Sequence, residues 1–146
     1  MLSQKILTYL QDEPTLLPEN RDSYLSFLRK KGFKENSAFF QLATTYGTEF
    51  NGSEGFMFNV VRDLMDETVT GVNYNMHTIE KVPKNLISLL EDTTYAFLLY
   101  DKDNDSVILV EDAGVEKVLA GDYDRKWNTF NEFPEEFFDI DSSDIN

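Results

Sequence analysis

Four aspartates in one short stretch have nearly the spacing of a calcium-binding loop. Asp101, Asp103 and Asp105 alternate with other residues, and Asp112 stands at the twelfth place. In a calcium loop, oxygen side chains at alternate positions converge on one ion. Here, however, the sixth residue is Ser106 instead of glycine, the twelfth is not glutamate, and the flanks are strand-like. The sequence therefore favours an exposed turn, in which aspartate bonds to nearby backbone groups, and we expect no bound metal or other cofactor.

A hydrolase would need an activated nucleophile or a pair of carboxylates, and the sequence marks neither. His77 is the only histidine and there is no cysteine, so a catalytic triad would have to use His77 with one of several serines. No Gly-x-Ser-x-Gly motif marks such a serine. The adjacent Glu135 and Glu136 would point to different sides of a helix, which favours a solvated face over glycoside hydrolysis. We expect no enzymatic activity, and a small carboxylate-based hydrolase is the least favoured alternative.

The glycine-rich stretch from Gly47 to Gly55 is not a phosphate-binding loop. It lacks the lysine followed by serine or threonine that holds phosphate and magnesium in a P-loop. It also contains Glu49 and Glu54, which would repel phosphate. We expect a flexible connection, and a contact loop for a partner is the functional alternative.

The net charge is the most unusual property of the sequence. It is −14, from 27 acidic and 13 basic residues. Nucleic-acid binding needs clustered lysine and arginine, and the only basic run is residues 29–31, so we expect no nucleic-acid partner. A negative field speeds encounter with a basic protein and keeps identical molecules apart. We therefore expect a basic protein partner and a monomer. The residues expected to contact the partner are Asp101, Asp103, Asp105, Glu111 and Asp112.

Size and composition predict one folded domain over residues 1–146, with an acidic tail from about residue 139. A chain of 146 residues with 41% hydrophobic residues can bury a core. Near the N-terminus, Asp12 and Glu13 stand where a signal peptide would have small residues. No stretch approaches the roughly 20 apolar residues of a membrane span. We expect a cytoplasmic protein without membrane contact.

Three helices are predicted in the first third of the chain, over residues 3–12, 18–32 and 36–47. Apolar residues recur in each segment at helical spacing. Pro18 suits the first turn of the second helix. Gly32 suits the left-handed backbone conformation that ends this helix.

A small sheet is predicted in the middle of the chain. Tyr95–Tyr100 and Ser106–Glu111 are β-prone runs that flank a turn, which indicates a hairpin. Val115–Leu119 could add a third strand, and Leu86–Leu90 could lie on the other side of the pair. Phe56–Val61 is also typical of a buried strand.

Two further segments complete the prediction. Residues 62–85 indicate one helical turn near residues 63–67 and then an extended passage. The aromatic residues from 127 to 138 return to helical periodicity and predict a final helix that packs on the sheet. Helices first, a sheet in the middle and a closing helix give the α+β class.

Three segments resemble motifs of one known superfamily. Residues 39–47 resemble a helix that ends in a Tyr-Gly turn, residues 95–111 a central strand pair, and residues 127–133 a closing W-x-S-F-x-E-F segment. Together they are similar to the SUKH superfamily, which includes bacterial immunity proteins and fungal regulators of cell-wall assembly and glucan synthesis. The resemblance covers roughly residues 18–138. The Leu-Pro-x-x-Tyr motif with which the family begins is matched only loosely, from Leu17.

The resemblance implies a SUKH-like single domain with N-terminal helices, a central antiparallel or mixed sheet and a C-terminal helix on the sheet. It also implies a protein that binds and neutralises a toxin, often a nuclease, whose basic face suits an acidic inhibitor. A regulatory scaffold similar to the glucan-synthesis regulators is the alternative. The family has no general catalytic residues. Because large aromatic side chains dominate core burial, the expected structural core contains Phe39, Phe40, Phe97, Trp127, Phe130 and Phe133.

Overall fold

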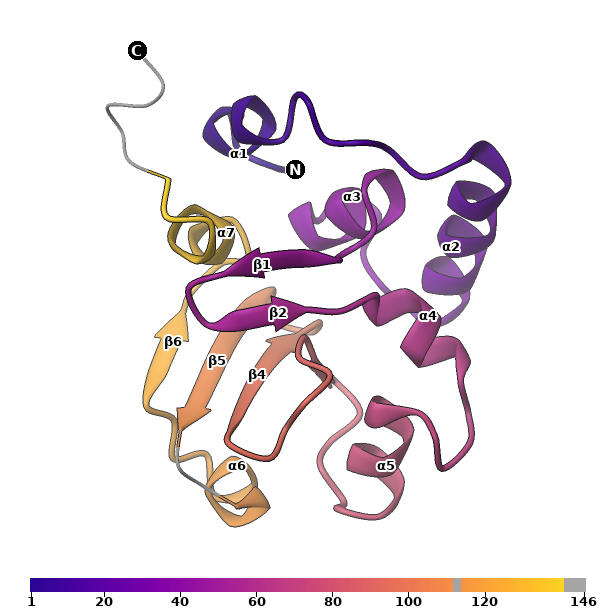
Figure 1. Cartoon of the computed structure of the whole chain (residues 1–146). Helices are drawn as coiled ribbons and strands as arrows, with labels where there is room; N and C mark the ends of the chain where they lie inside the picture. The colour runs from indigo at the N-terminus through magenta and orange to yellow at the C-terminus, as the bar shows by residue number, and fades with distance from the viewer. Residues whose placement is uncertain (112–113, 141–146) are drawn as a thin grey trace.

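The structure is a computed structural model that describes residues 1–111 and 114–140. Figure 1 shows the elements in chain order. The helices are α1 (Gln4–Tyr9), α2 (Pro18–Lys30), α3 (Ala38–Thr45), α4 (Val60–Met65), α5 (Val72–Thr78), α6 (Val115–Ala120) and α7 (Glu132–Phe137). The strands are β1 (Phe50–Gly52), β2 (Gly55–Met57), β3 (Leu86–Ser88), β4 (Ala96–Asp101), β5 (Ser106–Glu111) and β6 (Arg125–Trp127). The predicted α+β class, with helices at both ends of the chain, is confirmed.

The central sheet is antiparallel, with the strand order β3-β4-β5-β6. β4 and β5 form the predicted hairpin, in which Ala96 pairs with Glu111 at one end and Asp101 with Ser106 at the other. The predicted strand near Leu86 is also confirmed, because β3 pairs with the outer side of β4. β6 completes the sheet beside β5.

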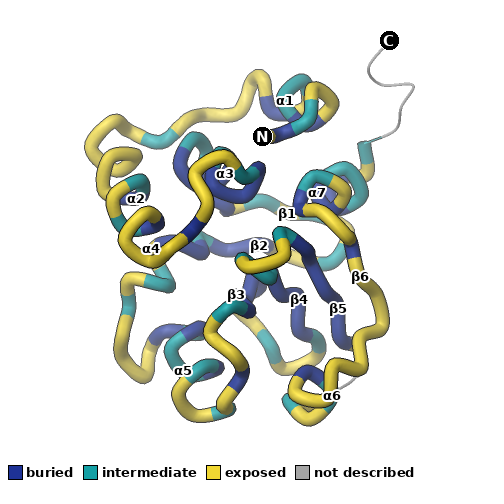
Figure 2. The backbone as a smooth tube through the Cα atoms, turned by 180° about the vertical axis from the view of Figure 1, so that it is seen from behind, coloured by how far each residue is buried: buried dark blue, intermediate teal, exposed yellow. Residues whose placement is uncertain are grey.

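The sheet is covered on both faces. Along β4, side chains alternate between two hydrophobic clusters, as strand geometry requires: Leu98 and Tyr100 join the larger cluster, whereas Phe97 and Leu99 join the smaller one. Figure 1 shows the β1–β2 hairpin and helices α3 and α7 on one side of the sheet, with α5 and α6 near its lower end. From behind, Figure 2 shows β4 and β5 buried while β6 and α6 carry exposed residues.

Aromatic stacking joins the first helices to the sheet and to the closing segment. The Phe39 ring on α3 stacks on Tyr100 of β4 at a centroid distance of 4.4 Å, and it meets Phe130 edge-on at 5.5 Å. Trp127 and Phe133 make a second edge-on pair at 5.1 Å. The six aromatic residues expected in the core are each 4% exposed or less. These rings connect segments that are almost a hundred residues apart in the sequence.

Local signals explain the N-terminal helices. Pro18 is the first residue of α2, and Gly32 beyond its end has a φ of 84°, a left-handed value that favours glycine. The Ser37 hydroxyl caps α3 by accepting from the Phe40 N–H at 3.1 Å. These three helices lie within the predicted ranges, and α1 is shorter than expected.

Side chains of α5 satisfy the outer edge of β3. The Asn73 amide accepts from the Ser88 N–H at 2.7 Å and donates to the Ser88 carbonyl at 3.5 Å. His77 Nε2 lies 2.7 Å from the Leu86 carbonyl oxygen, to which it donates. An edge strand otherwise presents unpaired backbone groups, so these two side chains replace a neighbouring strand.

Two predicted strands are helices instead. Only the start of Phe56–Val61 is a strand (β2), because the Asn59 side chain accepts from the Arg62 N–H and begins α4. The predicted strand Val115–Leu119 is α6, which ends at Gly121 with a φ of 72°. In both segments, short apolar runs fit a strand and a buried helix equally well.

The segment expected to be extended contains α5. The Asp63 carboxylate accepts from the N–H groups of Val72 and Asn73 at 2.7 and 3.0 Å, which caps the start of this helix. Asp63 lies nine residues before Val72 in the sequence, so no local sequence motif predicts this cap. The helical turn expected near residues 63–67 is the second half of α4.

The remaining corrections concern the closing segment and the glycine-rich stretch. Trp127, expected in the final helix, ends β6, and α7 begins at Glu132. Gly47–Gly55 is not a simple connection, because it contains β1 and the turn of the β1–β2 hairpin.

No helix in the described part of the chain is long and apolar enough to cross a membrane.

Candidate protein-binding surface

The expected contact residues are divided between the two ends of the β4–β5 hairpin. Asp101, Asp103 and Asp105 lie at its turn, whereas Glu111 lies at the far end of β5. With six residues in each strand, a rise of 3.3 Å per residue separates the two ends by about 17 Å. Asp112 lies outside the described residues. These acids therefore do not form one continuous patch.

At the turn, Asp101 holds the hairpin to the residues before β3. Its carboxylate accepts from the Asn85 amide at 3.0 Å, the Asp103 N–H at 3.1 Å and the Asn104 amide at 2.7 Å. Burial acts to raise the pKa of Asp101, but these hydrogen bonds outweigh it and hold that pKa below its ordinary value. Asp101 is thus an ionised structural group.

The other two aspartates of the turn also contact protein groups. Asp105 accepts from the Tyr100 hydroxyl at 2.8 Å and has a left-handed φ of 55°. Burial raises the pKa of Tyr100, and the Asp105 carboxylate raises it further, so this hydroxyl stays protonated. Asp103 is exposed, with its carboxylate 3.6 Å from the Lys102 ammonium. Protein groups thus hold the carboxylates of Asp101 and Asp105, and Lys102 offsets part of the charge of the turn.

The structure gives no support for a calcium loop at this turn. In the described part of the chain, no group of three or more histidine, aspartate or glutamate side chains lies close enough to hold a metal ion. Asp101 and Asp105 direct their oxygens at protein donors. The exposed-turn interpretation agrees with these contacts.

The opposite end of the hairpin combines exposed tyrosines with carboxylates. Tyr95, directly before β4, is 78% exposed. Because Ala96 pairs with Glu111, Tyr95 lies beside the end of β5. The Glu111 N–H donates to the Asp124 carboxylate at 2.6 Å, which brings in Tyr123, 38% exposed. We call this surface the acidic end; its residues, all exposed, are Glu91, Asp92, Tyr95, Glu111, Asp122, Tyr123 and Asp124.

Three segments position the acidic end. Glu91 and Asp92 belong to the loop that leads into β4, Glu111 ends β5, and the remaining acids precede β6. Figure 1 shows these segments together at the lower margin of the sheet, beside α6. The pairing of β5 with β4 and with β6 therefore sets the spacing of these segments.

Two acids of this surface have pKa values below their ordinary value. The Glu111 N–H is the largest cause that lowers the pKa of Asp124, and the Lys117 ammonium, 3.4 Å away, lowers it further. Hydrogen bonds from Thr94 lower the pKa of Asp92. The acidic end thus carries five carboxylates, and Lys117 is the cation paired with one of them.

Such a surface is suited to binding basic protein. Tyrosine supplies a large contact area with few rotatable bonds, and it is enriched among the residues that carry most of the binding energy. Surrounding carboxylates pair with lysine and arginine and exclude mismatched partners. The tyrosines would thus supply binding energy, and the carboxylates would select for a basic partner.

The carboxylates considered for hydrolysis have structural roles. Glu135 accepts from the Ser3 hydroxyl at 3.2 Å and so joins α7 to α1. Glu136 accepts from the Trp127 indole N–H at 3.2 Å and pairs with Arg125, which joins α7 to β6. Their side chains point in different directions, as the helical spacing predicts.

The acidic end was not predicted as a unit from the sequence. The run Asp122-Tyr123-Asp124 already combines a tyrosine with two acids, and that local signal was available. Its position beside Tyr95 depends on the pairing of β6 with β5. The sequence predicted no strand there and placed Trp127 in the final helix. Of the expected contact residues, Glu111 is the one that the structure places here, and Asp112 lies outside the described residues.

Comparisons of the chain with protein-family models, with curated proteins and with solved structures gave no significant match.

Proposed function

We propose that this chain is a non-catalytic protein-binding domain of the SUKH type, an immunity protein that neutralises a toxin such as a nuclease domain. The observation that carries the proposal is the acidic end, where the exposed Tyr95 stands beside Glu111 and the Asp124 segment. A basic surface of the toxin would bind to the acidic end. The protein acts in the cytoplasm of the producing cell.

The charge supports this class of partner. A nuclease has a basic face because it must bind phosphates, and an acidic inhibitor that covers this face blocks the substrate. The net charge of −14 attracts such a partner over long range and raises the association rate. Close contact then depends on the tyrosines, since exposed ion pairs contribute little by themselves.

The proposal is tested on a partner identified by capture from the native cell. The wild-type chain and the variant Tyr95→Ser are immobilised in parallel, and bound proteins are identified by mass spectrometry. The captured partner is then purified, and its nuclease or other toxic activity is measured with each variant. We expect inhibition by the wild type and a loss of affinity of at least about tenfold for Tyr95→Ser.

Asp103→Asn at the turn end is the matched control, since it changes one exposed acid about 17 Å from the acidic end. It should inhibit like the wild type. A partner that binds without loss of its own activity would instead favour the regulatory scaffold. Equal affinity of wild type and Tyr95→Ser would exclude the acidic end as the contact surface.

A further inference from the structure

A pocket of about 740 Å³ lies between α2, α5 and the β3 edge of the sheet, on the side of the β4–β5 turn. The acidic end is at the other end of the hairpin, so the pocket is a separate feature. Its lining includes three of the chain's 13 basic residues, although the molecule is strongly acidic. These are Lys31, Lys84 and Lys102.

Two of these lysines lie on neighbouring chain segments. The Lys102 N–H donates to the Asn85 carbonyl at 3.0 Å, and Lys84 is the residue before Asn85. Both side chains line the pocket. Like charges that lie close together repel each other, and an anion between them would reduce this repulsion.

Two acids, Asp66 and Glu67, also line the pocket, and both contact other protein groups. Glu67 pairs with Lys31 at 3.0 Å. The Asp66 carboxylate accepts from the Thr68 N–H at 3.2 Å, and hydrogen bonds from threonines lower its pKa. In the part of the chain that the structure describes, Lys84 forms no ion pair, and Lys102 has one, at 3.6 Å, with the exposed Asp103. Lys84 therefore offers its positive charge to a ligand, and Lys102 does so beside its contact with the exposed Asp103.

The rest of the lining offers aromatic surface. Phe27, Phe33 and Tyr74 contribute rings to the pocket. The Lys102 ammonium lies 5.7 Å from the centre of the Phe33 ring, which places charge and ring side by side. Pockets of roughly 300–1,000 Å³ are typical of small-molecule sites lined by apolar groups and a few polar ones.

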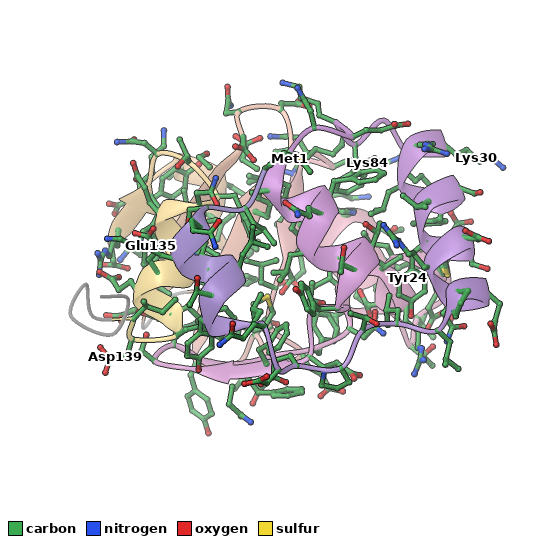
Figure 3. All side chains as sticks on the ribbon, turned by 90° about the horizontal axis from the view of Figure 1, so that it is seen from above. Met1, Tyr24, Lys30, Lys84, Glu135 and Asp139 are labelled. Atoms are coloured by element: carbon green, nitrogen blue, oxygen red, sulfur yellow. The ribbon has the colours of Figure 1, made fainter. Side chains whose placement is uncertain are left out.

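We infer that this pocket binds a small organic anion, a phosphate or carboxylate on a flat ring. The anionic group lies between Lys84 and Lys102, and the ring packs against Phe33 and Tyr74. Figure 3, seen from above, shows Lys84 on the same side of the molecule as Lys30 at the end of α2, away from Glu135 and Asp139. This basic corner can attract an anion that the rest of the molecule repels.

Four probes separate the two parts of the ligand. Calorimetric titration of the full chain uses phenyl phosphate, benzoate, inorganic phosphate and phenol. We expect phenyl phosphate or benzoate to bind more tightly than about 1 mM, and phosphate or phenol alone to bind at least about tenfold more weakly. The tighter of the two ring anions identifies the anionic group.

The variants K84Q and K102Q should each weaken that binding about tenfold, because each removes a charge-assisted contact. K126Q on β6 is the matched control: it removes the same charge from an exposed position remote from the pocket lining. Its affinity should equal that of the wild type. Equal affinity for phenyl phosphate and inorganic phosphate, or equal weakening by K126Q, would overturn the inference.

Stability provides a second readout without ligand. If Lys84 and Lys102 repel each other, K84Q should melt at a higher temperature than K126Q in low salt, and the difference should shrink as salt rises. A lower or equal melting temperature for K84Q would contradict the repulsion. Toxin inhibition by K84Q should be unchanged, so failure of the pocket and failure of the proposed function are distinguishable.

Discussion

Individual polar side chains in this protein mostly hold elements together. Asn73 is the clearest case, since it is 1% exposed and supplies both hydrogen bonds to Ser88 on the outer edge of β3. Its backbone N–H and its side-chain amide also donate to the Asp63 carboxylate. One amide thus connects α4, α5 and the sheet.

Asn73→Ala should lower the free energy of unfolding by about 1–3 kcal/mol, because it leaves the buried backbone of Ser88 without a partner. Urea unfolding followed by circular dichroism measures the change. Asn20→Ala, on the exposed face of α2, is the control and should change stability by less than about 0.5 kcal/mol. Equal stability of the two variants would mean that water replaces the amide.

Asp101 should make stability depend on pH in acid. Its pKa is lower in the folded protein than in the unfolded chain, so the unfolded chain binds more protons. Its contribution is therefore complete above the ordinary value of 3.8 and is lost as the pH falls through the folded pKa.

Asp101→Asn should be less stable than the wild type at neutral pH and should lose less stability below about pH 4. Urea midpoints measured from pH 7 down to about pH 3 give both numbers. Asp103→Asn is the control, because the Asp103 side chain accepts no hydrogen bond from the described residues. The same flattening in both variants would show that general charge repulsion, not Asp101, sets the acid slope.

At the scale of elements, the β1–β2 hairpin is seated on α7 through a glycine. A Cβ atom at Gly52 would overlap the Phe137 ring and its carbonyl oxygen. The neighbouring Ser53 N–H donates to that same carbonyl at 2.8 Å. The close approach of the two backbones therefore requires glycine.

Gly52→Ala should destabilise the protein by about 1–3 kcal/mol, as overpacking of a rigid contact does. Gly114→Ala is a matched control, because there the added carbon meets the flexible end of the Glu116 side chain. Thermal unfolding compares the two variants. If Gly114→Ala were the more damaging change, the hairpin would not be fixed against α7.

Prediction from the sequence succeeded for elements with strong local signals. Pro18 and Gly32 delimit α2, and the aspartate-rich turn delimits the β4–β5 hairpin. It failed for α6 and for β6, where runs of three to six residues carry no decisive period. The missed strand β6 is part of the candidate site, because its pairing with β5 brings the Asp124 segment close to Tyr95. The candidate site depends on contacts that no local pattern encodes.

On the scale of the whole molecule, charge is unevenly distributed. Lysines 34 and 102 contact the β4–β5 turn, and Lys84 lies nearby, whereas the opposite end of the sheet carries five exposed carboxylates. The acidic end therefore attracts a basic partner more strongly than the β4–β5 turn does, because lysines lie close to the aspartates of the turn. Orientation during encounter follows from this asymmetry.

Association with the basic partner should slow by tenfold or more between low and physiological salt, since charge steering is screened. Stopped-flow mixing measures the rate. The pair of changes Asp122→Asn and Asp124→Asn should reduce this salt dependence, and Asp103→Asn should reduce it less. An association rate that does not vary with salt would contradict the electrostatic part of the proposal.

The side chains along the outer edge of β3 also determine how copies of this protein can meet. Because Asn73 and His77 occupy the backbone groups of that edge, a strand from another molecule could extend the central sheet only beside β6. There, Lys126 is exposed and Arg125 pairs with Glu136, and such charged side chains on an edge strand oppose edge-to-edge pairing of two copies. Fibre growth through this sheet is thus opposed at both margins.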